Sequence, residues 1–560
     1  LSYGEFDARG ARWSPDGRRI AYVSNEGGDG AIRILELPGA PSRPLAITSR
    51  RYLQPMGRLD LVIRDADGDP VPARVSIMAS DGRAYAPDDA WIHADDSFDR
   101  ADAPIEQRYF HADGQATAML PPGPATITIW RGLEHSVETR TVEIAADATA
   151  ELTVALAPRA PEGLDDWPSG DVHVHMNYGG AYRNTPARMV AQAEAEDLDI
   201  VFNTIVNKEV RIPDIGYFST TPDPVSTDDT LLVPAQEFHT SFWGHLGLLG
   251  LSDHYLVPGY TAYPGTGLAS LWPDNPAIAA DARGQGALVG YVHPFDPGAE
   301  PNSYSTHAVP VDAALGNIDY YEVVGFADHF ASAAIWHRLL NLGFRIAAAG
   351  GTDAMANYAS LRGPVGINRT YVLPERGGGS LVERRDAWLA GLRAGRSMAT
   401  NGPLLTLSVE GEGPGGVIAR PAGGGRLRWR ADMTSIAAVD HVEIVHNGEV
   451  VATAPIAADG RSARGEGEIE VSESGWILLR AWSAEDRPEI LDTYPYATTS
   501  PVYVSVDGAR PRSPEDAAYM LAWLELIERA AREGEYNDES ERAEVLGNIA
   551  RAREVYEGMR

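Results

Sequence analysis

The sequence predicts a multidomain protein of the α/β plus β class, in which a parallel α/β barrel is flanked by β-sandwich domains and followed by a helical hairpin. Three observations support this prediction. The chain has 560 residues, which is more than a single hydrophobic core accommodates. Residues 169–403 alternate between strand-like and helix-like segments, as parallel α/β folds do. The regions on either side alternate apolar and polar residues with the period of β-strands.

The first two segments are expected to be β-domains. Residues 11–23 predict a strand, a Pro-Asp-Gly turn and a second strand, and they resemble one blade of a TolB-like β-propeller. One blade cannot close a propeller, so the fragment at residues 1–50 is either part of a longer propeller or packs on the rest of the chain. Short alternating strands at residues 56–158 resemble a carboxypeptidase-regulatory-type β-sandwich.

The remaining domains are predicted in the same way. Strand–helix units at residues 165–403 favour a barrel with its reactive groups at the C-terminal ends of the strands. Residues 404–508 return to β patterning, and Asn447-Gly448 predicts a hairpin in a second β-sandwich. Residues 512–560 start with a helix-capping Ser-Pro and are expected to form a packing hairpin, with a dimer contact as the alternative.

Composition limits the partners and the chemistry. The net charge of −32 disfavours a nucleic-acid partner. The absence of cysteine excludes disulfides, thiolate metal sites and cysteine nucleophiles. No apolar run approaches the ~20 residues that span a bilayer. We therefore expect a small-molecule substrate and no membrane span, allow a homo-oligomer, and favour a periplasmic or secreted location over a cytoplasmic one.

Histidines and carboxylates recur at the ends of apolar segments. His173 and His175 end a strand-like run, and they should project to the same face because alternate residues of a strand do so. Imidazole is a common metal ligand. Further imidazoles and carboxylates follow near glycine or proline, and the full set is His173, His175, Glu237, His245, His293 and Asp353. Such a set suits two adjacent divalent metals that share a carboxylate.

Four segments together resemble a known family, the CehA/McbA metallohydrolases of the PHP (polymerase and histidinol phosphatase) superfamily. The similar stretches are residues 170–180, 236–247, 290–295 and 350–357. The resemblance covers about residues 165–405 and implies a distorted (β/α)7 barrel with two divalent metal ions. Zn²⁺ is expected, with Mn²⁺ or Fe²⁺ as alternatives.

The resemblance also implies the ligand set. One metal would be held by His173, His175 and Asp353. The other would be held by His245 and His293, with Glu237 as the bridge. Many PHP proteins hold a third metal, whose ligand positions carry Asn177, Asn203 and Met355 here. We therefore expect two metals, with Lys208 either supplying positive charge near the third position or lying on the surface.

The expected reaction is hydrolysis of a carbamate, carboxylic ester or amide by a hydroxide that the metal pair generates near neutral pH. The candidate catalytic residues are Glu237, His329 and Lys208. His329 is expected to donate a proton to the leaving group, with a hydrogen-bonded structural histidine as the alternative. The candidate substrate-binding residues are Tyr178, Arg183, His239 and Arg362. Turn packing, support of a metal ligand and surface ion pairs are the alternatives for these four.

Two other functional classes stay open. A phosphoesterase is known elsewhere in the superfamily, but the missing third-metal ligands disfavour it mildly. A non-catalytic glycan- or ligand-binding protein would fit the flanking β-domains. It would leave six clustered imidazoles and carboxylates without a reason to converge.

Overall fold

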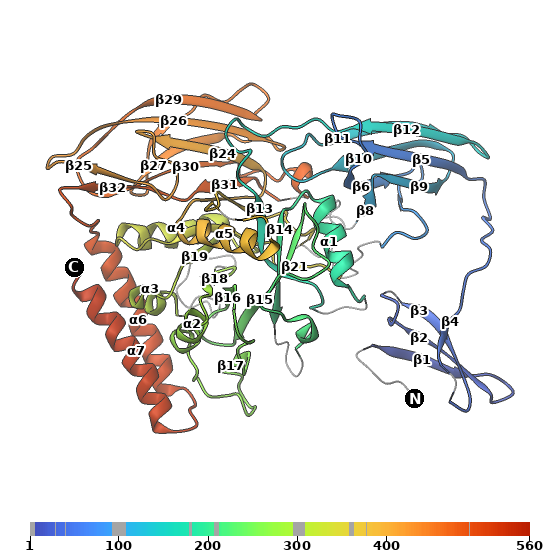
Figure 1. The fold of residues 1–560 in the computed structure, drawn as a ribbon, viewed down its shortest axis with the longest axis horizontal. Helices are drawn as coiled ribbons and strands as arrows, with labels where there is room; N and C mark the ends of the chain where they lie inside the picture. Colours follow the sequence, from blue (N-terminus) through green and yellow to red (C-terminus); the bar gives the residue numbers. More distant parts are fainter. Residues whose placement is uncertain are drawn as a thin grey trace.

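The computed structural model describes residues 6–28, 30–39, 41–91, 108–178, 182–206, 212–294, 308–357, 363–376, 378–491 and 493–560. Strands make up 37% of these described residues and helices 19%, and Figure 1 shows the arrangement of both. The predicted fold class is therefore wrong: among these residues the central strands do not form a closed (β/α)7 barrel but belong to a large mixed sheet. The strand–helix alternation was local, and it did not determine how the strands pair.

The N-terminal part contains three sheets. An antiparallel sheet consists of β1 (Ala8–Trp13), β2 (Arg19–Ser24), β3 (Ala31–Glu36) and β4 (Arg43–Pro44). A five-stranded sheet with the order β11-β10-β6-β7, and β8 on β6, shares one apolar core with a three-stranded sheet of order β12-β5-β9. Their bounds are β5 Gly57–Arg64, β6 Pro72–Met78, β7 Ala84–Tyr85, β8 Phe110–Asp113, β9 Gln115–Leu120, β10 Gly123–Trp130, β11 Glu138–Ile144 and β12 Thr149–Ala155.

A 17-stranded mixed sheet begins at β13. Strands β13, β14 and β15 are parallel, β16 is antiparallel to β15 and β18, and β18, β19 and β20 are parallel again. β13 also pairs with β21 and β22, so segments nearly two hundred residues apart lie side by side. The bounds are β13 Ser169–His175, β14 Ile200–Val206, β15 Leu231–Thr240, β16 Leu246–Leu249, β17 Tyr260–Thr261, β18 Leu288–Tyr291, β19 Tyr320–Val324, β20 Ala347–Gly350, β21 Ala354–Met355 and β22 Arg369–Val372.

The same sheet continues into the C-terminal β region. β23 pairs with β22 on one side and with β31 on the other, which carries the hydrogen-bonded ladder past residue 404. A second layer with the order β24-β26-β29 covers an apolar core that it shares with this part of the sheet. The bounds are β23 Ser397–Thr400, β24 Pro403–Val409, β25 Val417–Arg420, β26 Gly425–Ser435, β27 His441–His446, β28 Glu449–Thr453, β29 Ser462–Val471, β30 Gly475–Trp482, β31 Tyr496–Thr499 and β32 Val502–Val506.

Helices follow capping signals in the sequence. Ser and Asp side chains accept hydrogen bonds from the first-turn N–H groups of most of them, and Ser380 forms a full capping box with Glu383. The helices are α1 Pro186–Ala195, α2 Asn275–Gly284, α3 Val309–Leu315, α4 His329–Asn341, α5 Leu381–Arg393, α6 Pro514–Glu533 and α7 Glu539–Glu557, with 3-10 turns at Ile215–Tyr217 and Pro488–Ile490. The α6–α7 pair packs its apolar stripe into the core that surrounds β18 and β19. No helix among the described residues is long and apolar enough to cross a membrane.

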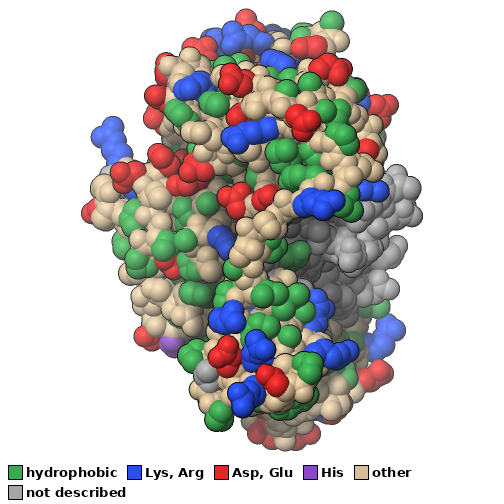
Figure 2. Space-filling view, turned by 90° about the vertical axis from the view of Figure 1, so that its right-hand side faces the viewer, with side chains coloured by type: hydrophobic (Ala, Val, Ile, Leu, Met, Phe, Trp, Pro, Cys, Tyr) green, Lys and Arg blue, Asp and Glu red, His purple; other side chains and the backbone are tan. Residues whose placement is uncertain are grey.

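Buried ion pairs join the N-terminal sheets to the central region at the end of α1. The Arg74 guanidinium lies 3.2 Å from the Glu196 carboxylate, and both side chains are almost fully buried. Arg131 donates to the Asp197 carboxylate at 2.6 Å and to the Glu194 carbonyl oxygen at 2.9 Å. Elsewhere, on the face shown in Figure 2, basic and acidic side chains lie interspersed and form no single patch of one sign.

Candidate metal centre

The His-x-His pair on β13 points both imidazoles to one place. Val172 and Val174 alternate with the histidines and pack into apolar clusters, as the two-residue period of a strand requires. Nδ1 of His175 donates to the carbonyl oxygen of Thr204 at 2.8 Å, and Nδ1 of His173 lies 3.2 Å from the Glu322 carboxylate. These partners turn the two Nε2 atoms inward, where they lie 3.2 Å apart.

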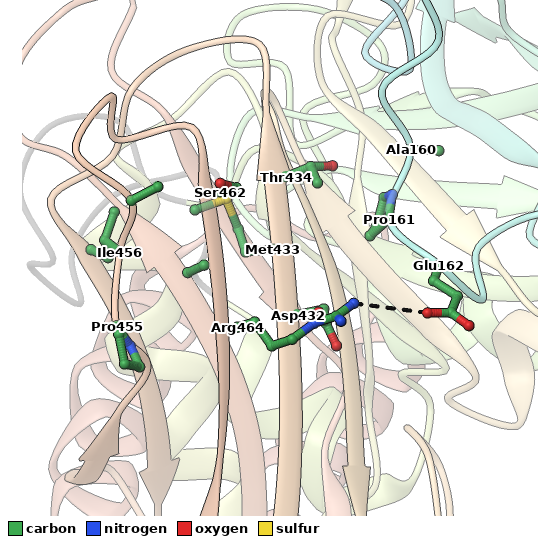
Figure 3. Close-up of a pocket in the computed structure, with 12 residues that line it drawn as sticks. Ala160, Pro161, Glu162, Asp432, Met433, Thr434, Pro455, Ile456, Ser462 and Arg464 are labelled. Carbon is green, nitrogen blue, oxygen red and sulfur yellow. Dashed lines mark hydrogen bonds and ion pairs between the residues drawn. The ribbon is translucent and has the colours of Figure 1, made fainter.

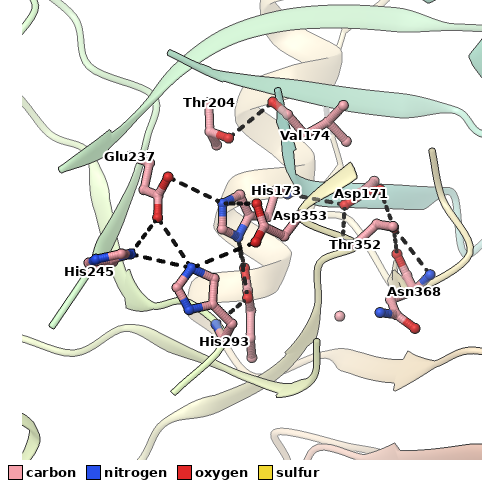
Figure 4. A network of polar contacts seen from close by, with 12 residues as sticks. Asp171, His173, Val174, Thr204, Glu237, His245, His293, Thr352, Asp353 and Asn368 are labelled. Carbon is pink, nitrogen blue, oxygen red and sulfur yellow. Dashed lines mark hydrogen bonds and ion pairs between the residues drawn. The ribbon is translucent and has the colours of Figure 1, made fainter. Parts of the chain in front are cut away.

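Glu237, near the end of β15, lies between two sets of histidines. Its Oε2 lies 3.6 Å from His173 Nε2 and 3.2 Å from His175 Nε2. Its Oε1 lies 2.9 Å from His245 Nδ1 and 3.3 Å from His293 Nε2 (Figure 4). The side chain is 2% exposed. Each carboxylate oxygen therefore faces a different pair of imidazoles.

Asp353 completes the cluster from the loop after β20. Its Oδ1 lies 3.0 Å from His175 Nε2 and 3.5 Å from His173 Nε2, and its Oδ2 lies 3.9 Å from His293 Nε2. Asp353 and His293 both have a positive φ, at 55° and 29°. Such backbone conformations cost about 1–3 kcal/mol each and cluster at functional sites. Hydrogen bonds hold them here: Asp353 N donates to the His173 carbonyl oxygen, and His293 N donates to Glu322.

The donor atoms have the spacing that a metal ion needs. A tetrahedral ion with bonds of 2.0–2.1 Å keeps its ligand atoms about 3.3 Å apart. Around His175 Nε2, the nearest atoms of the other three residues lie at 3.0 to 3.2 Å, and the group comprises His173, His175, Glu237 and Asp353. These buried groups could therefore hold a metal ion. All six residues of the predicted ligand set lie together.

The charges in the cluster stabilise one another. Burial would lower the pKa of His173, but the Glu322, Asp353 and Glu237 carboxylates raise it well above its usual value. Burial would raise the pKa of Glu237, but the surrounding histidines lower it well below its usual value. These opposite shifts have one cause, the close contact between the imidazoles and the carboxylates in a buried place.

Two buried carboxylates that sequence reasoning missed support the cluster. Glu322 on β19 bonds both His173 and the backbone of His293, and it is 0% exposed. The backbone of Gly351 passes close to this carboxylate. A Cβ at that position would lie 2.5 Å from Glu322 Oε1, so glycine is required there. The available signal was a lone acid inside the apolar run Tyr320–Val324.

Asp171 is the second missed carboxylate. It accepts hydrogen bonds from the backbone N–H groups of His173, Thr352 and Gly366, and from the Thr352 hydroxyl at 2.6 Å (Figure 4). Burial raises its pKa to about 6. By tying β13 to the loop that carries Asp353, Asp171 sets the position of that ligand.

The other predicted residues lie at different distances from the cluster. The centre of the half-buried Tyr178 ring lies 5.0 Å from the centre of the His175 ring. The ring centres of His239 and His245 lie 3.7 Å apart. Backbone N–H of Arg183 donates to Gly28 of the N-terminal sheet at 2.7 Å, so this residue also contacts another domain. Lys208 and Arg362 lie outside the described residues. The roles assigned to these residues stay predictions.

His329 makes the contacts of a structural histidine. It is the first residue of α4, its Nε2 donates to the Gly325 carbonyl oxygen at 3.1 Å, and its backbone N–H donates to the Tyr494 hydroxyl at 2.9 Å. Burial lowers its pKa to about 4. These contacts involve none of the six cluster residues, so they match the structural alternative more closely than the proton donor.

The amides at the third-metal positions bind protein groups. Asn203 Oδ1 accepts from the backbone N–H of Met176 at 3.0 Å, and Asn177 Nδ2 donates to Asp214 at 2.8 Å. Asn177 Oδ1 also accepts a hydrogen bond from the backbone N–H of Asn184. Both side chains thus hold the loop after β13 in place.

A separate pocket of about 600 Å³ lies on the C-terminal β region (Figure 3). Arg464 in its wall pairs with Asp432 and with Glu162 of the linker before β13. Its one guanidinium thus pairs with both of its carboxylates, and no group of metal-ligating side chains occurs there within the described part of the chain.

No family model matches the chain, and no curated protein matches it. GBS52, the minor pilin of Streptococcus agalactiae, is 13% identical over 25% of this chain and 68% of its own, with a TM-score of 0.15. The Bacillus anthracis TIE protein is 11% identical over 29% of each chain, with a TM-score of 0.14. Endonuclease Q in complex with abasic DNA is 15% identical over 40% of this chain and 56% of its own, with a TM-score of 0.26. Such scores do not establish a shared fold, so function must be inferred from the site.

Proposed function

We propose that this protein is a metal-dependent hydrolase of a carbamate, carboxylic ester or amide bond, and that it acts with two divalent ions, Zn²⁺ foremost. The observation that carries the proposal is the position of Glu237. Its two oxygens face two different pairs of imidazoles, at distances of 2.9 to 3.6 Å. A carboxylate shared in this way is typical of two-metal hydrolytic sites.

The ligands would divide into two sets. His173, His175 and Asp353 would hold one ion, and His245 and His293 the other, with Glu237 between them. Bound divalent ions would lower the pKa of a coordinated water to about 7 and polarise the oxygen that gains charge. Two neutral imidazoles and a carboxylate leave positive charge at such a centre, which favours attack on a carbonyl carbon.

The chain's own residues prepare this site. The Thr204 carbonyl oxygen and the Glu322 carboxylate hold the β13 imidazoles with Nε2 inward, because each accepts a hydrogen bond from an Nδ1–H group. The ligand side chains are buried, apart from His293, whose side chain is 14% exposed. Substrate would therefore approach on the His293 side. The resemblance of the four segments to CehA/McbA metallohydrolases supports a carbamate as the first substrate class to test.

The test is a set of parallel assays on the full chain loaded with Zn²⁺ or Mn²⁺. The substrates are 1-naphthyl methylcarbamate, a p-nitrophenyl carboxylic ester and p-nitrophenyl phosphate. We expect turnover of a carbon ester that falls at least 10³-fold in Glu237→Gln. Glu443→Gln removes another buried carboxylate, in β27 and far along the chain; it is the control and should keep its activity.

The outcomes separate the candidate functions. Turnover of the phosphate alone would replace the proposal with a phosphoesterase. Metal binding without turnover of any of the three substrates would refute a hydrolase of these classes and favour a binding protein.

A further inference from the structure

His239 lies on the same side of β15 as the carboxylate that the two histidine pairs share. Glu237 and His239 are two residues apart, so they project to one face of the strand. Phe238 between them is fully buried in the apolar core on the other face. Glu237 and His239 thus repeat on β15 the arrangement of the two histidines on β13.

The strand pairing brings His239 opposite a residue of the ligand set. β15 and β16 are antiparallel, with Glu237 opposite Gly247 and Phe238 opposite Leu246. Continuing this register by one residue places His239 opposite His245. The centres of the two imidazole rings are accordingly 3.7 Å apart, with an angle of 60° between the ring planes. Cross-strand neighbours of this kind are close enough to bind a common ion.

Neighbouring groups fix the ring of His239, but one of its two nitrogen atoms lacks a hydrogen-bond partner among the described residues. Tyr260 of the parallel strand β17 packs its ring 5.0 Å away, and the His239 backbone N–H donates to Gly259 at 3.3 Å. Within the described residues, Nδ1 of His239 is buried and has no hydrogen-bond partner. A buried polar atom of this kind needs a partner. The ligand atoms of Glu237, His239 and His245 all lie within 4.8 Å of one another.

We propose that His239 is a further ligand of the ion held by Glu237 and His245. This inference rests on the proposed function. It adds that the two metal centres differ in their ligands. The centre at His173 and His175 would have two nitrogen and two oxygen ligands. The centre at His239 would have three imidazoles and one carboxylate oxygen. Imidazole-rich sites favour Zn²⁺, whereas carboxylate-rich sites also accept Mn²⁺, so the chain would select different ions at its two centres.

The experiment measures metal binding, not activity. The full chain is stripped, loaded with Zn²⁺ or Co²⁺, and analysed for metal content by equilibrium dialysis and for coordination by Co²⁺ visible absorption. We expect two equivalents in the unmodified chain. In His239→Ala one equivalent should keep its affinity and the other should weaken at least tenfold, with a loss of tetrahedral Co²⁺ absorption. His239→Gln fills the space between His245 and Tyr260, and it should show the same loss if the alanine variant does not fold.

The matched control is His254→Ala. His254 is 62% exposed and pairs with Asp253, so its removal should leave both equivalents unchanged. Two tightly bound equivalents and an unaltered Co²⁺ spectrum in both His239 variants would overturn the inference while leaving the proposed function intact. Unchanged metal binding together with a raised KM of His239→Ala in the substrate assays of the proposed function would also overturn it, because His239 would then contact substrate. If the unmodified chain binds no metal, both proposals fail.

Discussion

Glu322→Gln tests whether the buried carboxylate behind the ligands sets metal affinity. Glu322 accepts hydrogen bonds from the His173 imidazole and from the backbone N–H of His293, which lies 2.7 Å from its Oε2. The His293 N–H and His173 Nδ1 both bond Oε2, at 2.7 and 3.4 Å, while Oε1 lies 3.2 Å from His173 Nδ1. Glutamine keeps the shape, but with its oxygen on the His293 N–H its NH₂ group faces the Nδ1 proton of His173, and two donors repel each other. The backbone N–H is the closer and less mobile donor, and we expect the His173 ring to lose its partner.

The expected magnitude follows from losing that orientation. Loss of the partner of a metal-ligating histidine costs about 10–100-fold in affinity, or about 1.4–2.7 kcal/mol. At a free ion concentration of 100 Kd, binding stabilises the folded chain by about 2.7 kcal/mol. A tenfold weaker affinity would lower this to about 1.4 kcal/mol, and a 100-fold weaker one to about 0.4 kcal/mol.

The assay is a chelator competition for Zn²⁺ at fixed pH, combined with calorimetry with and without the ion. Glu443→Gln is again the control, because Glu443 is also a buried carboxylate, bonded to Arg480 and Trp482. It should lower stability without changing the stabilisation that Zn²⁺ adds. A folded Glu322→Gln variant with the affinity of the unmodified chain would show that Glu322 does not act through His173.

Three further predictions concern stability. Asp171→Asn should lower the unfolding free energy by about 1–3 kcal/mol in urea titrations. The NH₂ group of the asparagine would face N–H or O–H donors from which the carboxylate now accepts hydrogen bonds. Burial raises the pKa of Asp312 from 3.8 to about 7, so the folded form binds a proton that the unfolded form has released. Stability should therefore fall as pH rises from about 4 to 7, by up to about 4 kcal/mol; Asp312→Asn should remove this slope in calorimetry at pH 5 and pH 8. Arg131→Met should destabilise the partly buried contact with Asp197 by about 1–2 kcal/mol and speed proteolysis of the linker at residues 158–168, whereas Arg83→Met, at an 81% exposed arginine, should not.

Local pattern was sufficient to place many of the strands and the last two helices. β13 ends at His175 and α6 starts after Ser513, as the local pattern predicts, and α7 follows from Glu539 within the predicted hairpin. Such boundaries depend on neighbouring residues: alternation of apolar side chains for a strand, and a side chain that accepts first-turn N–H groups for a helix. The convergence of the six metal-ligand candidates was also expected, because each stands near the end of an apolar segment.

Pairing between distant strands could not be obtained in this way. A strand's sequence does not say which edge it will join, so the closed barrel was predicted where β23 instead carries the sheet from β22 to β31. The same limit applies to Glu322, whose partners lie 149 and 29 residues away along the chain. It applies to His329 as well, since its contact with Tyr494 spans 165 residues.

The sequence by itself determined which side chains are available as ligands, and which of them share a strand face, because a two-residue period needs only local backbone geometry. Only the tertiary structure decided that Glu322 and Asp171 hold the ligands in position and that His239 faces His245. Those relations depend on strand register and on the packing of segments far apart in the chain, and hydrogen-bond ladders settle them only when the whole sheet has formed.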